Sequence, residues 1–413
     1  MAHAVARAMA TGEHLLVQAG TGTGKSLAYL TPALLADGPV VVSTATLALQ
    51  AQLVEHDLPR LAEAAEPLLG RRPTYAVLKG RHHYLCLARL ESSEEQEPAD
   101  ALFESSGGGG TTWLGEAGRL GAQIRRLREW AMETDTGDRD ELDPGVEAHA
   151  WRLVSMPARE CVGAQRCGYG AECFAEASRA RAREADIVVT NHSLLAVDML
   201  AGRHIVPPHT LLVVDEAHEL ADRVSAAAQA ELVPELVDRL ARRLRPVAPV
   251  TAQEALAEAG DALAAGLADA PAGRLTAGLP PALREACTLL DAAARAAREA
   301  VGEIKAEDGD AVRKQAARAG LDEMSATAQR LLAEHEHDVA WVERPEWAGG
   351  GRRALVVAPL SVASTLATHL FADRTVVATS ATLALGGRFD TAARMLGLTG
   401  PPADAAPASG APD

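Results

Sequence analysis

Short runs of apolar and β-branched residues recur along the chain, with helical stretches between them. The runs occupy residues 14–18, 40–43, 187–190, 211–215, 354–358 and 375–379. Because their side chains are apolar on both faces of a strand, they predict a parallel sheet covered by helices on both sides, and hence an α/β fold. Three of the runs end in polar residues. Such sheets bind their ligands at the carboxyl edge of the strands, so we expect the chemistry there.

Two long segments interrupt this pattern. Residues 85–178 contain four cysteines, the acidic stretch ESSEEQEPAD and a run of four glycines. Residues 220–347 are rich in Ala, Leu, Glu and Arg with helical spacing, and they predict an inserted helical domain. The α/β domain is assigned to the remaining parts, which are residues 1–84, 179–219 and 348–398. Residues 399–413 have little apolar content and predict a disordered tail.

The composition is that of a globular protein with more than one domain. The chain has 413 residues, of which only 3% are aromatic, and a formal net charge of -16. This charge excludes attraction of the whole surface to nucleic acid, so any such contact must be local. Two basic stretches are candidates, and a solvated helix face is the alternative for each. They comprise Arg71, Arg72, Lys79, Arg81 and Arg89, and then Arg119, Arg125, Arg126 and Arg128.

A glycine-rich loop, AGTGTGKS, follows the first predicted strand. Its residues are Ala19, Gly20, Thr21, Gly22, Thr23, Gly24, Lys25 and Ser26. Glycines at such a place let backbone N–H groups approach phosphate oxygens where a helix begins. In this pattern Lys25 is expected to hold the β- and γ-phosphates, and Ser26 is expected to ligate Mg²⁺. The loop therefore predicts nucleotide binding.

The run LLVVDEAH places acidic residues at the carboxyl end of another predicted strand. Asp215 is expected to hold Mg²⁺, and Glu216 is expected to orient and activate the water that attacks the γ-phosphate. His218 is a candidate relay to a third motif. That motif comprises Thr379, Ser380, Ala381 and Thr382. An acidic helix cap is the alternative reading of the run, and the phosphate loop argues against it.

Four of the five cysteines lie between the phosphate loop and the acidic motif. They are Cys86, Cys161, Cys167 and Cys173, spaced as one remote residue followed by C-x5-C-x5-C. Four thiolates suit a [4Fe–4S] cluster, and the tight C-x2-C pairs typical of zinc sites do not occur here. Zinc and unligated thiols stay open as alternatives. Cys287, in an Ala-rich stretch, is expected to be an ordinary buried thiol.

The sequence has no apolar run long enough to cross a bilayer and no secretory signal pattern at its N-terminus. It therefore predicts a cytoplasmic protein that does not engage a membrane. In that compartment the cysteines are expected to be ligands, redox groups or core thiols rather than disulfides. The segment around the cysteines has little apolar content, so a cluster there is expected to be what stabilises its fold.

With these motifs in place, the chain resembles the DinG/XPD family of superfamily 2 DNA helicases. The resemblance includes VVSTATLALQAQL at residues 41–53, KGRHHYLC at 79–86 and TNHSLL at 190–195. It continues with PPHTLLVVDEAHEL and VVATSATL in the same order as in the family. It covers nearly all of residues 1–398.

The resemblance implies a fold, an activity and cofactors. The fold is a RecA-like P-loop NTPase domain, interrupted by an iron–sulfur domain at 85–178 and an all-helical arch domain at 220–347. The activity is ATP-dependent 5′-to-3′ translocation on single-stranded DNA, with unwinding of forked or overhang duplexes in DNA repair or replication. The cofactors are ATP, Mg²⁺ and a [4Fe–4S] cluster. The residues expected to contact DNA phosphates are Lys79, Arg81, Arg125 and Arg128.

The sequence departs from the family pattern in two respects. It begins without the upstream motif that reads adenine, and it stops soon after the third motif, before a second RecA-like domain with its arginine finger. A gene fragment, a truncated sequence and one half of a split helicase, completed by a second chain, all stay open. Two other functions stay open as well. One is a module that binds ATP and DNA without unwinding, and the other is a redox sensor whose cluster gates DNA binding.

Overall fold

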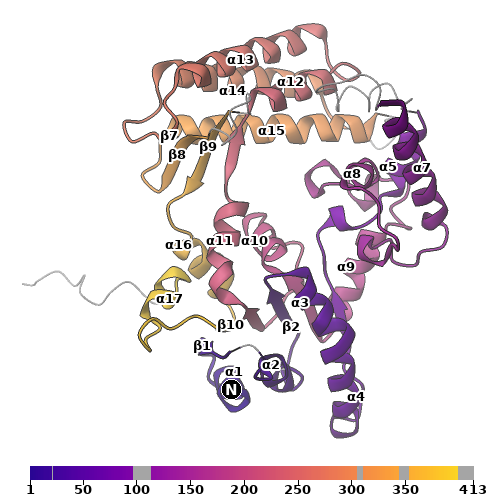
Figure 1. Ribbon diagram of the computed structural model, residues 1–413, viewed down its shortest axis with the longest axis vertical. Coiled ribbons are helices and arrows are strands. Elements are labelled where there is room, and N and C mark those ends of the chain that lie inside the picture. Colours follow the sequence, from indigo (N-terminus) through magenta and orange to yellow (C-terminus); the bar gives the residue numbers. More distant parts are fainter. Residues whose placement is uncertain (21, 96–112, 305–309, 344–352, 399–413) are drawn as a thin grey trace, which may run out of the picture. The chain divides into compact units, whose positions relative to one another are not determined.

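The computed structural model describes residues 1–20, 22–95, 113–304, 310–343 and 353–398 (Figure 1). These residues form two compact units. The first contains the described parts of 1–79, 179–229 and 359–413, and the second contains those of 80–178 and 230–358. The finer division into motor, iron–sulfur and arch segments stays a prediction. The acidic stretch, the glycine run and the predicted tail lie wholly or largely outside the described residues.

A six-stranded sheet forms the centre of the first unit. Its paired strands are parallel, and their order is β1-β10-β5-β2-β4-β3. The strands are β1 (Leu15–Gln18), β2 (Val40–Thr44), β3 (Tyr75–Val77), β4 (Ile187–Asn191), β5 (Leu211–Asp215) and β10 (Thr375–Ser380). The sequence predicted all of these except β3, a three-residue edge strand that is only partly buried. The predicted α/β fold with a parallel sheet is confirmed.

Both faces of this sheet are buried, because alternate residues of a strand enter different cores. Val40 and Val42 of β2 pack in one core with Leu30, whereas Val41 packs in another with Leu220. The helices of this unit are α1 (Ala2–Thr11), α2 (Lys25–Ala33), α3 (Leu47–Gln52), α4 (Leu58–Leu69), α10 (His192–Leu200), α11 (Leu220–Ala227), α16 (Ala363–Thr365) and α17 (Asp390–Met395). Through Leu220, α11 joins the core of the first unit, although the sequence placed it in the helical segment.

The cysteine-bearing part of the second unit has an apolar core of its own. Its members include Leu85, Leu127, Trp151 and Val154, and all four are almost completely buried. They lie in or beside the helices α5 (Leu87–Glu95), α7 (Trp113–Ala131) and α8 (Ala148–Val154), while α9 (Phe174–Glu184) follows the last cysteine. The prediction that this segment lacks the means to build a core is wrong. Its few apolar residues are widely spaced in the sequence, and the fold gathers them.

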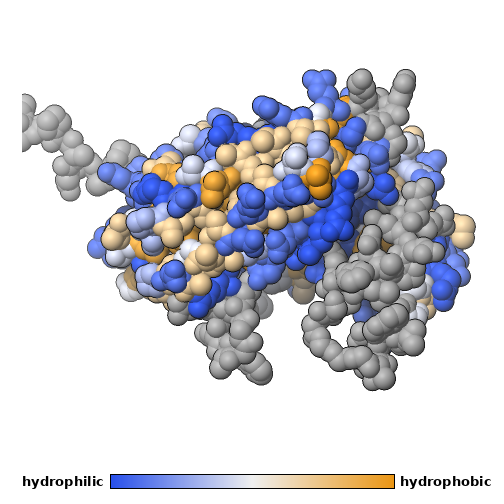
Figure 2. Space-filling model, turned by 90° about the horizontal axis from the view of Figure 1, so that it is seen from above, coloured by the Kyte–Doolittle hydropathy of each residue, from blue (hydrophilic) through white to orange (hydrophobic). Residues whose placement is uncertain are grey.

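Four helices form most of the remaining described part of the second unit and lie side by side in Figure 1. They are α12 (Pro234–Arg243), α13 (Val250–Asp269), α14 (Pro281–Val301) and α15 (Ala311–Ala333). Leu256, Leu290 and Leu321 belong to their shared core, and Cys287 of α14 is fully buried among them, as predicted. Figure 2, which views the molecule from above Figure 1, shows mildly hydrophobic residues interspersed with hydrophilic ones on the surface facing the viewer. No helix within the described ranges is long and apolar enough to span a membrane.

A second sheet packs against these helices. It shows that one strand was assigned to the wrong sheet. Its order is β6-β9-β8-β7, and β6 lies antiparallel to β9. The strands are β6 (Ala230–Leu232), β7 (Gly273–Arg274), β8 (Asp338–Glu343) and β9 (Ala354–Pro359). The run at 354–358 is therefore a strand, but it does not belong to the parallel sheet. It is apolar on both faces because Leu355 and Val357 face the helical core, whereas Ala354 and Val356 pack against Val233.

Candidate functional site

The phosphate loop joins the end of β1 to the start of α2. Gly22 and Gly24 have φ angles of 74° and 78°, in the left-handed region that glycine adopts without strain. The Thr23 hydroxyl donates a hydrogen bond to the Gly20 carbonyl at 2.8 Å, which closes the loop on itself. Ala19 is tied to the sheet through its N–H, which donates to Ser380 at 3.0 Å. Thr21 lies outside the described residues.

Lys25, the first residue of α2, reaches both acidic residues of the second motif. Its Nζ lies 2.8 Å from Asp215 Oδ1 and also contacts Glu216 Oε1. Burial alone would lower the pKa of Lys25, but the hydrogen bonds and charges of the two carboxylates outweigh it and raise that pKa. The ammonium group is therefore charged where anionic phosphates are expected.

The two acidic residues differ in backbone conformation: Asp215 is in a strand, whereas Glu216 is left-handed. Asp215 ends β5 and is almost completely buried, and its Oδ1 accepts the Glu216 N–H at 3.0 Å. Glu216 has φ 56° and ψ 47°, a left-handed conformation that is strained for a residue with a side chain. Such a backbone costs about 1–3 kcal/mol and is concentrated at functional sites. Although burial would raise it, the pKa of Glu216 is lowered by Lys25, so its carboxylate is ionised.

The third motif meets the second one through Ser380, at the end of β10. The Ser380 hydroxyl donates to Glu216 Oε2 at 3.0 Å and lies 2.8 Å from His218 Nδ1. Since the hydroxyl has only one proton and gives it to the carboxylate, the hydrogen between Ser380 and His218 must be on Nδ1. The Thr382 N–H also donates to Ser380 Oγ, at 3.3 Å. Thr379 is fully buried, and its Oγ1 has no hydrogen-bond partner among the described residues.

Removing the Ser380 hydroxyl should therefore weaken the coupling between the second and third motifs. We expect Ser380→Ala to lower ATP turnover by roughly 10-fold, because one lost hydrogen bond to a charged group is worth about 1.5 kcal/mol. Steady-state phosphate release measures this. Ser361→Ala is the matched control, since its hydroxyl accepts a hydrogen bond from the Ala363 backbone N–H at 3.3 Å and Ser361 belongs to none of the three motifs. Equal turnover in both variants would contradict the prediction.

Sequence reasoning missed a buried polar pair beside this site. Ser43 of β2 and His192 of α10 are both fully buried, and Ser43 Oγ lies 2.7 Å from His192 Nδ1. Burial lowers the pKa of His192 to about 4, so its ring is neutral. The only signal in the sequence was that both residues follow or end apolar strands, within segments noted for their resemblance to the helicase family. The pair links the end of β2 to the start of α10, which follows β4.

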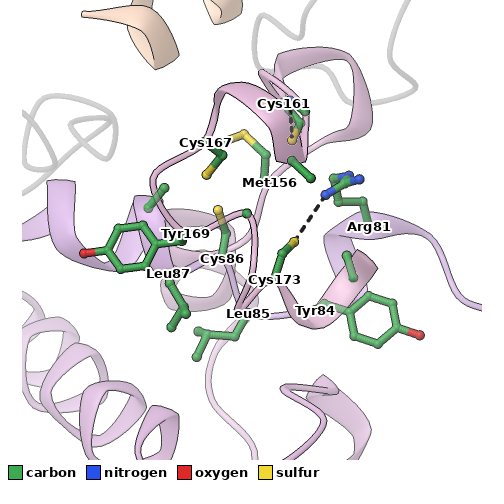
Figure 3. A pocket seen from close by; sticks show the side chains of 15 residues that line it. Arg81, Tyr84, Leu85, Cys86, Leu87, Met156, Cys161, Cys167, Tyr169 and Cys173 are labelled. Carbon is green, nitrogen blue, oxygen red and sulfur yellow. Dashed lines mark hydrogen bonds between the residues drawn. The ribbon is translucent and has the colours of Figure 1, made fainter. Parts of the chain in front are cut away.

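The four clustered cysteines line a single pocket in the second unit (Figure 3). Cys86 precedes α5, Cys173 precedes α9, and Cys161 and Cys167 lie in the irregular segment between α8 and α9. All four are partly accessible. Burial raises the pKa of Cys86, and the negative charges of the other three thiols raise it further. The sequence-predicted cysteine set is thus brought together from separate chain segments.

Arg81 also lines this pocket, although the sequence suggested it as a DNA contact. Its Nη1 lies 3.6 Å from Cys173 Sγ, and its Nη2 is paired with Glu176. Only 8% of the side chain is exposed. The Gly163 N–H donates to the sulfur of a second cysteine, Cys161 Sγ, at 3.4 Å. Positive charge and an N–H group thus face the sulfurs, as thiolates require.

Four thiols around one pocket could in principle hold a single zinc ion or a larger group. A tetrahedral zinc site needs four ligands at about 2.0–2.3 Å from one point. In the described parts of the chain, no group of three or more His, Cys, Asp or Glu side chains is arranged to hold one ion. The donor set of four soft thiolates fits a larger, sulfur-rich group, since such clusters take Cys ligands from several chain segments.

The two basic stretches have different surroundings in the structure. In the first, Arg71 pairs with Asp186, and Arg89 pairs with Glu160, so acidic residues distant in sequence neutralise them. In the second, on α7, the Arg126 guanidinium donates to the carbonyls of Pro144 and Gly145, and Arg125 is exposed. Arg128 and Lys79 are partly buried and have interaction partners. The assignment of DNA contacts stays a prediction.

The glycine loop, the acidic pair at the end of a central strand and the parallel sheet define the first unit as a RecA-like P-loop domain. Comparisons with known proteins narrow this class. The DEAD/DEAH box helicase family matches residues 2–74. The chain is 46% identical to the ATP-dependent helicase DinG of Mycobacterium tuberculosis (strain ATCC 25618 / H37Rv), over 97% of this chain and 61% of that protein. It is 37% identical to the ATP-dependent DNA helicase YoaA of Escherichia coli (strain K12), over 54% of this chain and 33% of YoaA.

Solved structures agree at the level of the fold. An XPD helicase matches with a TM-score of 0.50 and 12% identity, covering 96% of this chain and 59% of the XPD chain. A truncated XPD matches with a TM-score of 0.51 and 13% identity, covering 96% of each chain. The predicted resemblance is confirmed: the chain is similar to DinG helicases over 97% of its length, and its fold is similar to that of XPD helicases. It spans about 61% of the length of the DinG relatives that it matches.

Proposed function

We propose that this chain is the nucleotide-hydrolysing part of an ATP-dependent DNA helicase. One observation carries the proposal above the others. Lys25, Glu216 and Ser380 lie in one chain of hydrogen bonds, although 191 residues separate the first two and 164 the last two. Each comes from a different predicted motif, so the fold unites the phosphate loop, the acidic pair and the third motif. Its DinG and YoaA relatives are named as ATP-dependent helicases.

The nucleotide would bind where the loop and α2 present N–H groups and the Lys25 ammonium. Phosphate oxygens would compete with Asp215 and Glu216 for the Lys25 ammonium. Their binding would free Asp215 to ligate Mg²⁺ and Glu216 to orient the attacking water. Ser26 and Asp215 offer a hydroxyl and a carboxylate oxygen, the hard donors that Mg²⁺ prefers, so they fit this ion. When bound, Mg²⁺ neutralises charge on the phosphates.

Glu216 would act as the base or water-orienting group for hydrolysis. Its strained backbone points the side chain toward Lys25, and its ionised carboxylate can accept a hydrogen bond from water. Ser380 and His218 hold the opposite carboxylate oxygen. A change at one end of this chain of hydrogen bonds would therefore affect the other end, which supports a coupling role for Ser380 and Thr382 of the third motif. The coupling role of Thr379 stays a prediction from the sequence, because its hydroxyl has no hydrogen-bond partner among the described residues.

We further propose that Cys86, Cys161, Cys167 and Cys173 hold a [4Fe–4S] cluster. Two features support this: the four thiols share one pocket, and Arg81 and the Gly163 N–H face two of the sulfurs. Bound there, a cluster would cross-link the segments before α5, between α8 and α9, and before α9. Arg81 would offset part of the thiolate charge.

The proposed substrate is single-stranded DNA next to a duplex, in repair or replication, and 5′-to-3′ polarity follows from the resemblance. Among the predicted DNA contacts, Arg125 is the one that the structure leaves exposed. It lies on α7 of the cysteine-bearing part, and its neighbour Arg119 is exposed as well. Exposed arginines can pair with phosphates at the cost of few internal contacts. A partner chain carrying a second RecA-like domain is part of the proposal for the complete helicase.

Replacing Arg125 should weaken DNA binding in a salt-dependent way. We expect Arg125→Gln to reduce the slope of log affinity against log salt by about 0.7, the share of one phosphate contact on a single strand. Fluorescence anisotropy of a labelled oligonucleotide at several salt concentrations measures it. Arg274→Gln is the control, because Arg274 is also exposed in the second unit but belongs to neither basic stretch. An unchanged slope would remove Arg125 from the DNA surface.

A strand-displacement assay tests the proposed function. The full chain, purified without oxygen, is incubated with a duplex that has a 5′ single-stranded tail, with ATP and Mg²⁺. Displacement that stops without ATP supports the helicase proposal, and a 3′-tailed duplex serves as the polarity control. Binding of ATP and DNA without displacement would contradict unwinding by this chain and favour the alternative of a module that only holds both ligands.

A further inference from the structure

The side chain of Tyr29 lies fully buried beneath the candidate nucleotide site. Tyr29 is on α2, one helical turn after Lys25, and none of its surface is exposed. Its ring packs in the core between α2 and the sheet, together with Leu30 and Val42. A phenylalanine would fill the same volume. Burying the extra hydroxyl has a cost unless it is hydrogen-bonded, so the partner of that hydroxyl indicates what it does.

The partner is the carboxylate that ends β5. The Tyr29 hydroxyl donates to Asp215 Oδ2 at 3.0 Å, in a fully buried hydrogen bond. The other oxygen, Oδ1, accepts the Glu216 N–H at 3.0 Å and lies 2.8 Å from Lys25 Nζ. Both oxygens of Asp215 are thus held, and the rotation of its carboxylate is restricted.

This hydrogen bond lies next to the expected Mg²⁺ ligands. Ser26 and Asp215 are the two side chains expected to ligate the ion, one from the start of α2 and one from the end of β5. Tyr29 stands three residues after Ser26 on the same helix, and its hydroxyl holds Asp215.

We propose that Tyr29 is a positioning residue that orients the Asp215 carboxylate for Mg²⁺. The inference rests on the proposed function, because it assumes that the nucleotide binds with this ion. When phosphates draw Lys25 away from Asp215, the hydrogen bond from Tyr29 stays, since the phenol lies in the core and not in the loop. The carboxylate then keeps its orientation at the moment when the ion needs it.

The experiment compares Tyr29→Phe with the unaltered full chain. Binding of a fluorescent, slowly hydrolysed ATP analogue is measured by anisotropy, first in excess EDTA and then over a titration with Mg²⁺. We expect the half-saturating Mg²⁺ concentration to rise about 5- to 10-fold, the loss typical of one buried hydrogen bond to a charged group. Nucleotide affinity in EDTA should change less than about 2-fold, because Tyr29 does not face the phosphates.

Two further variants separate positioning from simple core stability. Tyr84→Phe also removes a buried hydroxyl, which lies 2.8 Å from Ser178 Oγ in the second unit, and it should leave the Mg²⁺ titration unchanged. Thermal unfolding of each variant is measured in parallel. If Tyr29→Phe does not fold, Tyr29→Met replaces it, because methionine also lacks the hydroxyl and adapts to the shape of a core. The same rise in the half-saturating Mg²⁺ concentration is then expected, and an unchanged value overturns the proposal.

The outcomes for the inference and for the proposed function are distinct. If the unaltered chain shows no Mg²⁺-dependent nucleotide binding, the proposed function itself fails. If the unaltered chain does show it and Tyr29→Phe has the same half-saturating Mg²⁺ concentration, only the inference is overturned. A lower unfolding temperature with an unchanged titration would likewise assign Tyr29 to the core alone.

Discussion

Replacing Glu216 by Gln is expected to lower ATP turnover by about 10²- to 10⁴-fold while nucleotide binding is kept. The amide has nearly the same shape as the carboxylate but cannot accept a proton from the attacking water. Lys25 still has Asp215 as a partner at 2.8 Å, so the loop should keep its charge arrangement. Ser380 can still donate to the remaining amide oxygen. The loss should therefore appear in the rate of turnover and not in the affinity.

Single-turnover phosphate release and nucleotide binding, measured on the same sample, test this prediction. Glu219→Gln is the matched control, because Glu219 lies three residues further along and pairs with Arg223 at 2.8 Å on the surface. Its turnover should stay within about 2-fold, as expected for an exposed pair. If Glu216→Gln kept turnover within 10-fold, or lost nucleotide binding, Glu216 would not have the catalytic role assigned to it.

Replacing Cys167 by Ser is expected to reduce bound iron from about four atoms per chain to fewer than one. A serine hydroxyl is a poor ligand for iron of this kind, and the three remaining thiols leave one position open. The iron content and the visible absorption of protein purified without oxygen measure the loss. Cys287→Ala is the matched control, because Cys287 is buried on α14 and its burial raises the thiol pKa to about 12.

The same variant distinguishes a structural cluster from a redox sensor. Leu127 and Trp151 belong to a core that does not include the cysteines, so we expect the helices around them to persist after the iron is lost. The loops that carry Cys161 and Cys173 should become sensitive to protease, because the cluster would be their main cross-link. Unchanged protease resistance with altered DNA affinity would favour the sensor. Full iron content in Cys167→Ser would exclude the proposed ligand set.

Much of the fold could be predicted because each strand carries its own signal. Val40 and Val42 point to one face of the sheet and Val41 to the other, so an uninterrupted apolar run indicates burial on both sides. The same signal misplaced Leu355, since a strand buried on both faces looks alike in a parallel and an antiparallel sheet. The pattern of apolar residues in a strand indicates which of its faces are buried. It does not indicate which strand lies beside it, because that depends on contacts distant in sequence.

The candidate site was predictable to a similar degree and for a similar reason. Lys25, Asp215 and Glu216 stand in short motifs whose spacing reflects the chemistry directly. Tyr29 and His192 could not be found in this way, because a buried tyrosine or histidine in an apolar stretch usually belongs to the core. Arg81 was assigned to DNA from its charge, but the structure places it beside Cys173. Its acidic partner, Glu176, is too far along the chain for a local pattern to reveal.

ATP hydrolysis by this chain, purified without oxygen, tests the central claim most directly. Phosphate release is measured with and without single-stranded DNA, and Lys25→Ala serves as the blank because Lys25 contacts both carboxylates of the site. We predict turnover that single-stranded DNA stimulates and that vanishes in the blank. Nucleotide binding without any turnover, with DNA present, would contradict the claim that this chain hydrolyses ATP as the motor of a helicase.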